Sequence, residues 1–265
     1  MNKVIDKENF ILQSPTTAFL VGLGFFCVFL VSCSEQKKYE LSYSWAPVEI
    51  TSEIKKSEEI EAIINPYKTK LDSIMDEVIG YSAKDLTTEG RYESTLGTFV
   101  TELLHKQSSA QYNTIVDVAL MNHHGGLRAP INEGPVTVGE VFQVMPFENE
   151  MLLLEVPGDK LLEIIKFVGN RNSSMIWPVS FDVSGAEILN IQVDGKEIES
   201  DRTYILSVSD YQANGGSGFE MLQPLKRLDI KPILLRDMIL SEIRELTARG
   251  EKINTKIANS IKVID

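Results

Sequence analysis

Two glycine-rich loops hold the residues of this chain that are best suited to binding a ligand. The first runs from Asn122 to Arg128 and reads NHHGGLR, and the second runs from Ser209 to Phe219 and reads SDYQANGGSGF. Paired glycines let backbone N–H groups come close to a ligand, and the forked guanidinium of Arg128 suits a phosphate or a carboxylate. Either loop alone is equally well explained as a tight turn. Their chemistry therefore depends on whether other elements bring them together.

A third segment lies between these loops and contains Pro146, Phe147 and Asn149. Taken together, the runs VDVALMNHHGGLRAPINEGPVTVGEVFQVMPFENEMLLLEVPGDKLLEII and VDGKEIESDRTYILSVSDYQANGGSGFEML resemble the C-terminal domain of the 5′-nucleotidase family. The resemblance extends over about residues 80 to 265 and rests on three separate motifs in the family's order.

The resemblance implies a domain that binds the base and the sugar of a nucleotide. In the family, two aromatic residues hold the base between them, and Phe147 and Tyr211 match those positions; stacking on an aromatic ring is worth about 1 to 3 kcal/mol per base. Asn149 matches a residue that contacts the base in some members, and Arg128 matches an Arg that holds the substrate. The substrate site implied in this way consists of Asn122, Arg128, Phe147, Asn149, Tyr211, Gly215, Gly216 and Ser217.

Two departures from the family pattern fall within this site. The family's Gly-Gly-Asp becomes Gly-Gly-Ser217, and a neutral hydroxyl in place of a charged acceptor is expected to lower the affinity for the sugar by about 1 to 2 kcal/mol. The family's Asn-x-Gly-Gly is also altered, because His123 stands at the expected place and Asn122 lies one residue upstream. Either residue could take the family's Asn position.

The metal chemistry of the family has no counterpart in this sequence. Hydrolysis there belongs to an N-terminal metallophosphatase domain in which Asp, His and Asn side chains hold two metals that activate water. This chain has three His and neither an Asp-x-His nor a Gly-Asn-His motif, and residues 33–79 are too few for such a domain. We expect His105 to be half-exposed and His123 and His124 to form a solvated pair in their loop, with binding of a metal or substrate by this pair as the alternative. No cofactor is expected in this chain, and divalent Zn, Mn or Mg only in a partner.

Two functions follow as alternatives. In the first, the chain is the substrate-recognising half of a split 5′-nucleotidase in nucleotide catabolism, and a separate metallophosphatase subunit supplies the metals. In the second, it is a non-catalytic nucleotide-binding or structural surface protein, as the changes at Asn122 and Ser217 would allow. The chain itself is a hydrolase by resemblance only.

The N-terminus predicts attachment to a membrane. Residues 18–31 are apolar, too short for a comfortable span of about 20 residues but suited to a signal peptide, and they end in Leu-Val-Ser-Cys33. This ending resembles a bacterial lipobox, which predicts a signal peptide over residues 1–32 and a lipid on Cys33; an uncleaved anchor helix is the alternative. Residues 33–51 would be a tether. We therefore expect the chain in the bacterial cell envelope, on the periplasmic face or the cell surface.

Charge and cysteine content exclude several kinds of partner and site. The 265 residues carry a net charge of -12, which argues against a nucleic-acid partner because that affinity rests mainly on Lys and Arg. The two cysteines are Cys27 and Cys33, so the folded body has no disulfide and no thiolate metal site.

Apolar spacing indicates the elements that must position the loops. Residues 52–80 predict an amphipathic connector helix, bent or interrupted near Pro66, that packs on its own domain or docks a partner. Residues 81–265 then alternate helical and extended patterns without a regular βαβ repeat, which favours an α+β or layered α/β domain, with mixed sheets flanked by helices. Helices are expected near residues 96–104, 159–168 and 232–249, and extended segments at 115–121, 151–156, 179–183, 188–193, 203–208 and 257–263.

Overall fold

The computed structural model describes residues 45–47, 49–51, 54–228 and 230–264. It divides into Met1–Lys55 and Lys56–Asp265, and the second unit contains every helix and strand among the described residues. The expected signal peptide, Cys33 and most of the tether lie outside the described residues. No helix in the described part of the chain is long and apolar enough to span a bilayer.

Helix α2 (Glu58–Met75) is shorter than the connector expected over residues 52–80. Ser57 caps its N-terminus by accepting a hydrogen bond from the backbone N–H of Ile60, and three glutamates in the first turn suit the helix dipole. A bend or an interruption was expected near Pro66, and the helix continues through this residue without interruption. It ends at Met75, and strand β1 (Val78–Ser82), which pairs with β3 (Gly134–Thr137), begins three residues later.

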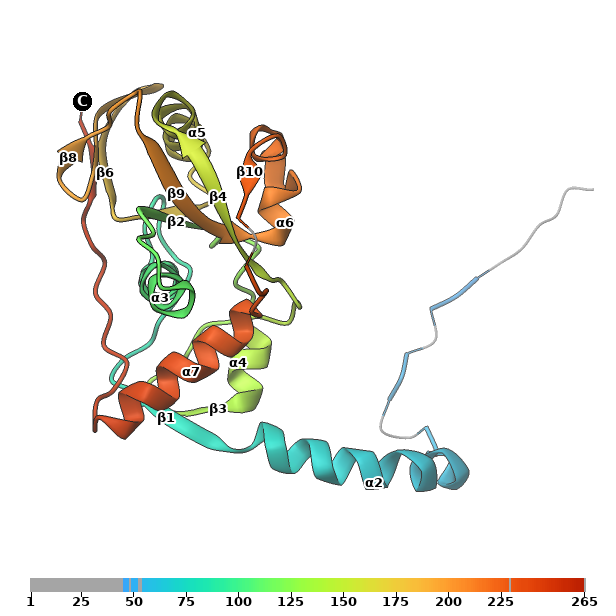
Figure 1. Ribbon diagram of the computed structural model, residues 1–265. Coiled ribbons are helices and arrows are strands. Elements are labelled where there is room, and N and C mark those ends of the chain that lie inside the picture. The colour runs from blue at the N-terminus through green and yellow to red at the C-terminus, as the bar shows by residue number, and fades with distance from the viewer. Residues whose placement is uncertain (1–44, 48, 52–53, 229, 265) are drawn as a thin grey trace, which may run out of the picture. The chain divides into compact units, whose positions relative to one another are not determined.

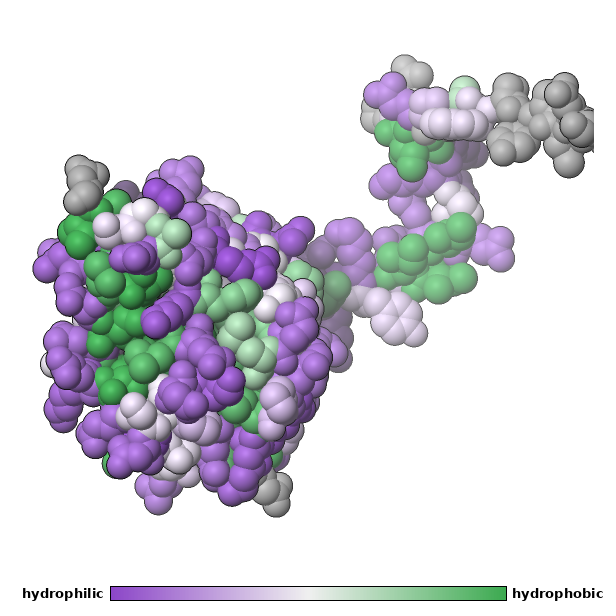
Figure 2. Space-filling view, turned by 90° about the horizontal axis from the view of Figure 1, so that it is seen from above, coloured by the Kyte–Doolittle hydropathy of each residue, from purple (hydrophilic) through white to green (hydrophobic). Residues whose placement is uncertain are grey.

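The apolar face of α2 is open to solvent. None of the side chains of this helix, which the structure describes throughout, is buried. Six large apolar residues of its face are each about half exposed or more, and Figure 2 shows apolar side chains gathered on the helix. They are Ile60, Ile63, Ile64, Tyr67, Leu71 and Ile74. Packing of the whole helix on its own domain was therefore the wrong alternative, and only its C-terminal Met75 packs against the core.

A five-stranded mixed sheet forms the centre of the domain. Its strand order is β10-β4-β9-β2-β5, with β2 and β9 parallel and the other pairs antiparallel. The strands are β2 (Val118–Met121), β4 (Met151–Pro157), β5 (Met175–Trp177), β9 (Thr203–Ser209) and β10 (Lys226–Arg227). Ile115 was expected in the first of these strands but is 78% exposed, and the strand begins three residues later.

Both faces of this sheet are covered, so β2 is buried on each side. Val118 and Leu120 belong to one apolar cluster and Ala119 and Met121 to the other, as the two-residue period of a strand requires. The first cluster includes α5 (Gly158–Arg171) and a four-stranded sheet of order β11-β6-β7-β8. That sheet consists of β6 (Val179–Ser184), β7 (Glu187–Val193), β8 (Lys196–Glu197) and β11 (Ile261–Val263).

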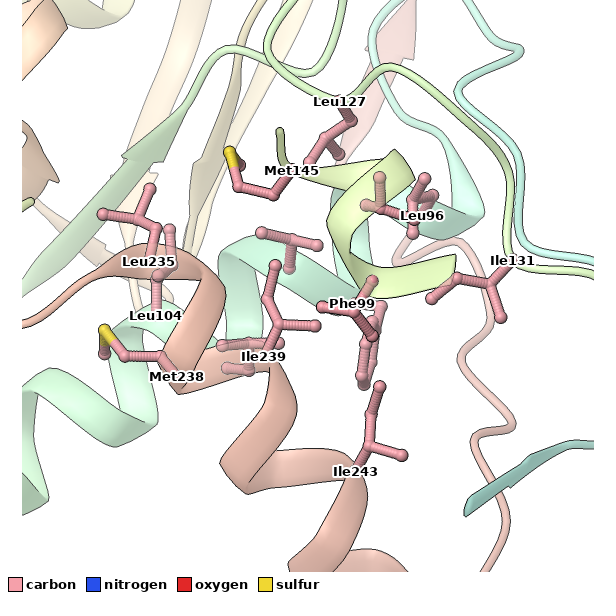
Figure 3. Close-up of a cluster of buried hydrophobic side chains, with 14 of the residues drawn as sticks. Leu96, Phe99, Leu104, Leu127, Ile131, Met145, Leu235, Met238, Ile239 and Ile243 are labelled. Atoms are coloured by element: carbon pink, nitrogen blue, oxygen red, sulfur yellow. The ribbon is translucent and has the colours of Figure 1, made fainter. Parts of the chain in front are cut away.

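On the opposite side of the five-stranded sheet, α3 (Thr95–Tyr112) packs directly against the strands (Figure 1). Helices α4 (Val138–Val144) and α7 (Leu235–Ala248) lie further from the sheet and complete the same apolar cluster. In Figure 3, Leu235, Met238, Ile239 and Ile243 of α7 point toward the side chains of α3, among them Phe99 and Leu104. These layers of helices and mixed sheets confirm the fold class expected from the sequence.

Two further boundaries differ from those expected. The helix expected near residues 232–249 begins at Leu235, and Gly250, with φ of 74°, follows its C-cap. Asp194–Gly195 is a tight hairpin signal that the sequence places between the expected strands 188–193 and 203–208, but this turn joins β7 to the short strand β8. The sequence could not show this, because two-residue strands carry too little pattern.

Candidate functional site

The ends of two parallel strands bring the two glycine-rich loops together. β2 ends at Met121 and β9 at Ser209, and because these strands are parallel neighbours their carboxyl ends meet at one edge of the sheet. The segment between α4 and β4 reaches the same edge, since Met151 pairs with Ser209. The three motifs singled out in the sequence are therefore neighbours in space.

Together they enclose a cavity of about 360 Å³. Six of the eight residues expected at the substrate site border it, namely Asn122, Arg128, Phe147, Asn149, Tyr211 and Ser217. Phe147 is 39% exposed and Tyr211 51%, so each ring offers a face to an incoming group. The guanidinium carbon of Arg128 lies 6.0 Å from the centre of the Phe147 ring. The cavity thus combines two exposed aromatic rings on different loops with one fixed positive charge.

Gly215 and Gly216 do not border the cavity, although they were expected to bind substrate. A Cβ atom on Gly216 would lie 2.5 Å from atoms of the Tyr211 ring. The backbone of this loop therefore lies directly behind the ring, where only a glycine fits without displacing it. The role that the structure gives to Gly216 is to support Tyr211.

Asn122 meets Ser217 at the base of the cavity. Their side chains are 2.8 Å apart, Asn122 amide to Ser217 hydroxyl. When the amide oxygen accepts from the hydroxyl, the amide nitrogen donates to the carbonyls of His124 and Ser173 at 2.7 Å each, so this orientation satisfies both ends of the amide. The Ser217 oxygen then keeps its lone pairs for a donor on a ligand. Asn122, and not His123, is thus the residue of this pair that faces the cavity.

The family model of the 5′-nucleotidase C-terminal domain matches residues 78–224, from the first residue of β1 to just beyond the second loop. The chain belongs to this family. A 5′-nucleotidase of Vibrio cholerae is 27% identical over 199 residues, covering 72% of this chain and 35% of that protein. The endonuclease YhcR of Bacillus subtilis is 31% identical over 192 residues, covering 69% of this chain and 15% of that protein.

Solved structures show the same fold. A 5′-nucleotidase precursor of Thermus thermophilus superposes with a TM-score of 0.65 at 22% identity, over 77% of this chain and 43% of that one. The chain therefore spans less than half the length of each of these relatives.

His123 is fully buried and does not border the cavity. The expectation of a solvated pair was therefore wrong for this residue. Its Nδ1 lies 3.0 Å from the hydroxyl of Ser94, which also caps α3 by accepting from the N–H of Gly97. Burial, and then the neighbouring His124, lower the pKa of His123 to about 4. The imidazole is therefore neutral at pH 7 and joins the loop to the start of α3.

Gly125 and Gly126, the paired glycines of the first loop, border the cavity, and so does His124. Sequence reasoning gave no role to three other residues that border it, Met121, Ser209 and Gln212. Gln212 follows Tyr211 directly, and its buried amide nitrogen has no hydrogen-bond partner among the described residues. Its own backbone N–H donates to the Ser209 hydroxyl, which caps the short helix α6 (Asp210–Ala213). The position of Gln212 beside the aromatic residue was the only sequence signal for it.

The electrostatics of the cavity favour an anionic or neutral ligand. Among the described residues that border it, Arg128 carries a fixed charge and there is no Asp or Glu. Within the part of the chain that the structure describes, no three His, Cys, Asp or Glu side chains come together as a metal site. The described residues therefore do not fit the two-metal centre of the family's hydrolytic domain.

A broader hollow, of about 720 Å³, lies on α3 and α7 beside residues 252–256. It contains none of the residues expected at the substrate site. His105, which borders it, is half-buried as expected. Burial raises the pKa of Glu102 and lowers that of His105 in this hollow.

Proposed function

We propose that the cavity binds the base and the sugar of a nucleoside phosphate, so that the chain is the nucleotide-recognising half of a 5′-nucleotidase-type hydrolase. The observation that carries this proposal is the pair of exposed rings, Phe147 and Tyr211, on two loops that border one cavity with Arg128. A purine or pyrimidine offers two flat faces to such rings, and each stacked face contributes about 1 to 3 kcal/mol. The 5′-nucleotidases among the relatives support a nucleotide as the ligand.

Arg128 has a specific part in this proposal. The chain carries a net charge of -12, so its general field opposes the approach of an anionic nucleotide. Among the described residues, the exposed guanidinium of Arg128 makes a single hydrogen bond, a long one of 3.4 Å to the carbonyl of Gly125. Its remaining donors are free to take a phosphate or ribose oxygen, and a charge-assisted bond of this kind is about twice as strong as a neutral one.

Hydrolysis in this proposal comes from a separate metallophosphatase chain. That subunit would hold the divalent metals, Zn, Mn or Mg, which the described residues of this chain do not fit. It would dock on the solvent-exposed apolar face of α2, because a continuous exposed apolar face is typical of a surface that binds another protein. The membrane attachment expected from Cys33 would place both subunits in the bacterial cell envelope; incorporation of labelled fatty acid into the chain, and its loss in Cys33→Ser, tests this point.

A second candidate is a non-catalytic nucleotide-binding or structural surface lipoprotein. Ser217 favours it, because a hydroxyl replaces the carboxylate that the family places against the sugar. The two candidates differ in whether a metallophosphatase binds the chain, so capture of that enzyme by the wild type but not by Ile63→Asp on α2 would favour the first.

Calorimetric titration of the purified chain with AMP and adenosine tests the binding site. Phe147→Ala should reduce the affinity about tenfold or more, because one stacked face is lost. Tyr81→Ala is the matched control, since Tyr81 is a 48% exposed aromatic residue on β1, outside the cavity. Unchanged affinity in Phe147→Ala would refute the pocket, and hydrolysis of AMP by the chain alone with Mn or Zn would refute both candidates.

A further inference from the structure

Arg236 is a buried cation that borders no part of the cavity yet contacts the loop that carries Phe147. It lies in the first turn of α7, and its side chain is only 8% exposed. One guanidinium nitrogen, Nη1, donates to the carbonyl oxygens of Met145 and Phe147, at 3.3 Å in each case. The guanidinium carbon also lies 4.1 Å from the centre of the Phe142 ring.

These contacts fix the backbone on both sides of Pro146. A buried carbonyl without a donor is costly, and a proline supplies no N–H to its own turn. A single atom of Arg236, Nη1, donates to the carbonyls of both residues that flank the proline. The ring of Phe142 lies against the planar guanidinium of Arg236. The peptide that leads into Pro146 and the one that leads out of Phe147 are therefore held by the same side chain.

The two ends of this loop are held by backbone hydrogen bonds. The N–H of Arg128 donates to the carbonyl of Val144 at 2.9 Å, and the N–H of Leu235 donates to that of Asn149 at 2.9 Å. Met145 and Leu235 belong to the same apolar cluster and are both drawn in Figure 3. The first turn of α7 thus holds the far end of the loop through Leu235 and its middle through Arg236.

We propose that Arg236 is a positioning residue that sets the orientation of the Phe147 ring at the cavity, and through it the affinity for an aromatic ligand. A buried charge costs free energy that an apolar side chain of similar volume would not, so stability alone gives no reason for an arginine at this place. The guanidinium supplies what an apolar side chain cannot, two directed hydrogen bonds to the loop. For its ligand, this inference rests on the proposed nucleotide binding.

The first test measures AMP binding by calorimetry in variants of the full chain. Arg236→Met keeps the volume and removes the donors, and it should lower the affinity about tenfold, the loss expected for charged hydrogen bonds to a carbonyl. Arg236→Lys keeps a charged donor without the planar fork, and its affinity should lie between those of Arg236→Met and the wild type. Urea unfolding of each variant separates this effect from a change in stability.

Two controls isolate the carbonyl contacts. Arg244→Met lies on the same helix, where Arg244 is exposed and pairs with Glu77, and it should leave the affinity unchanged. Glu148→Gln removes the carboxylate that lies 3.9 Å from Arg236 but is 83% exposed, and it should also have little effect because a solvated partner is well screened. A loss of affinity in Glu148→Gln as large as in Arg236→Met would assign the effect to the ion pair instead.

The second test needs no ligand. The indole introduced by Phe147→Trp reports the mobility of this position, after subtraction of the signal of the parent chain with its Trp45 and Trp177. Adding Arg236→Met should lower the anisotropy of that indole and raise its quenching by acrylamide, and Arg236→Lys should restore part of both. If the wild type binds no AMP, the proposed function fails, but the indole still decides whether Arg236 positions the ring.

The proposal is overturned if Arg236→Met folds and leaves both the anisotropy of the indole and the affinity for AMP unchanged. If Arg236→Met does not fold, Arg236→Lys decides, since it retains the charge. Values equal to the wild type in the lysine variant would show that any cation suffices and that the bridging geometry is irrelevant.

Discussion

The two walls of the cavity are built in different ways. The Phe147 wall, residues 145–149, is held from outside by a buried side chain of α7 and by hydrogen bonds at its ends. The Tyr211 wall, residues 209–219, is held next to its ring from within, by the Ser209 cap and by the close approach of Gly216. Arg171 and Arg227 hold it further along by donating to the carbonyls of Ser217 and Ala213. The backbone at Phe147 thus depends on a residue almost ninety positions away, whereas the Tyr211 ring rests on a glycine of its own loop.

This difference decides what each wall can tolerate. A change in the Tyr211 wall acts directly on its ring, because backbone and ring are already in contact. The Phe147 wall should tolerate changes of exposed side chains such as Glu148, but not loss of the buried Arg236. If this is so, the two walls respond separately to substitution, except where the base of the cavity connects them.

The largest expected effect is on stability and concerns His123, the residue that follows Asn122 at the base of the cavity. Its folded pKa of about 4 lies below the ordinary value of 6.5, so between these values the unfolded chain binds more protons than the folded one. Stability from this group is complete above pH 6.5 and is lost as the pH falls toward 4. The free energy of unfolding should fall by about 2 kcal/mol from this group between pH 7 and pH 4.5.

Urea unfolding at the two pH values measures this change. Carboxylates also titrate in the range, so the comparison is made with His123→Gln, in which the difference between pH 7 and pH 4.5 should be smaller by that amount. His124→Gln is the matched control, because His124 is the exposed neighbour in the same loop. An equal pH dependence in the wild type and in His123→Gln would show that His123 contributes nothing to acid sensitivity.

The second prediction concerns Gly216, the support of the Tyr211 wall. In Gly216→Ala the added Cβ would lie 2.5 Å from the ring, so the ring must move; overpacking of this kind costs about 1 to 3 kcal/mol. The affinity for AMP should fall about tenfold. The anisotropy of an indole at Phe147→Trp should stay as it is, since the other wall is held separately. If Gly216→Ala changed both the affinity for AMP and the anisotropy of the indole, the two walls would not be held separately.

The aromatic residues of both walls could be found from the sequence. Three glycines close to Tyr211 form one local signal, and the Pro-Phe motif at Phe147 forms another. The two loops meet because β2 and β9 are parallel neighbours. The apolar runs of the sequence predict the two strands but not their pairing. Arg236 gave no signal, because it belongs to an amphipathic pattern in which a polar residue is expected to face water.

Helices α2 and α7 show the same limit for apolar spacing. Both patterns predicted amphipathic helices, and both helices exist, but α7 buries Met238, Ile239 and Ile243 whereas α2 leaves its apolar face open. Spacing establishes which face is apolar and carries no information about what covers it. The same limit applies to His123 and His124, which are adjacent and identical in type. His123 is buried and His124 is exposed, and their residue type gives no sign of this difference.

The third prediction restores the charge that the family places at Ser217. Ser217→Asp should raise the affinity for AMP by about 1 to 2 kcal/mol, because a carboxylate is the stronger acceptor for sugar hydroxyls. The backbone at Ser217, with φ of 55°, is one that Asp adopts with little strain. Titration with AMP and with 2′-deoxy AMP measures the gain, which should be smaller for the deoxy compound. Equal gains would place the new carboxylate away from the sugar.

The smallest expected effect is that of Tyr211→Phe, and it separates the face of the ring from its hydroxyl. One face of the ring packs on Gly216 and the other is open to a ligand, and both faces remain in the variant. Stacking on a base depends on the open face and not on the hydroxyl. The affinity for AMP should therefore change by less than about 0.5 kcal/mol, whereas Tyr211→Ala should lose about 1 to 3 kcal/mol. Calorimetry of the two variants side by side measures both. A large loss in Tyr211→Phe would mean that the hydroxyl binds the ligand, and the Tyr211 wall would then recognise polar groups that the Phe147 wall cannot.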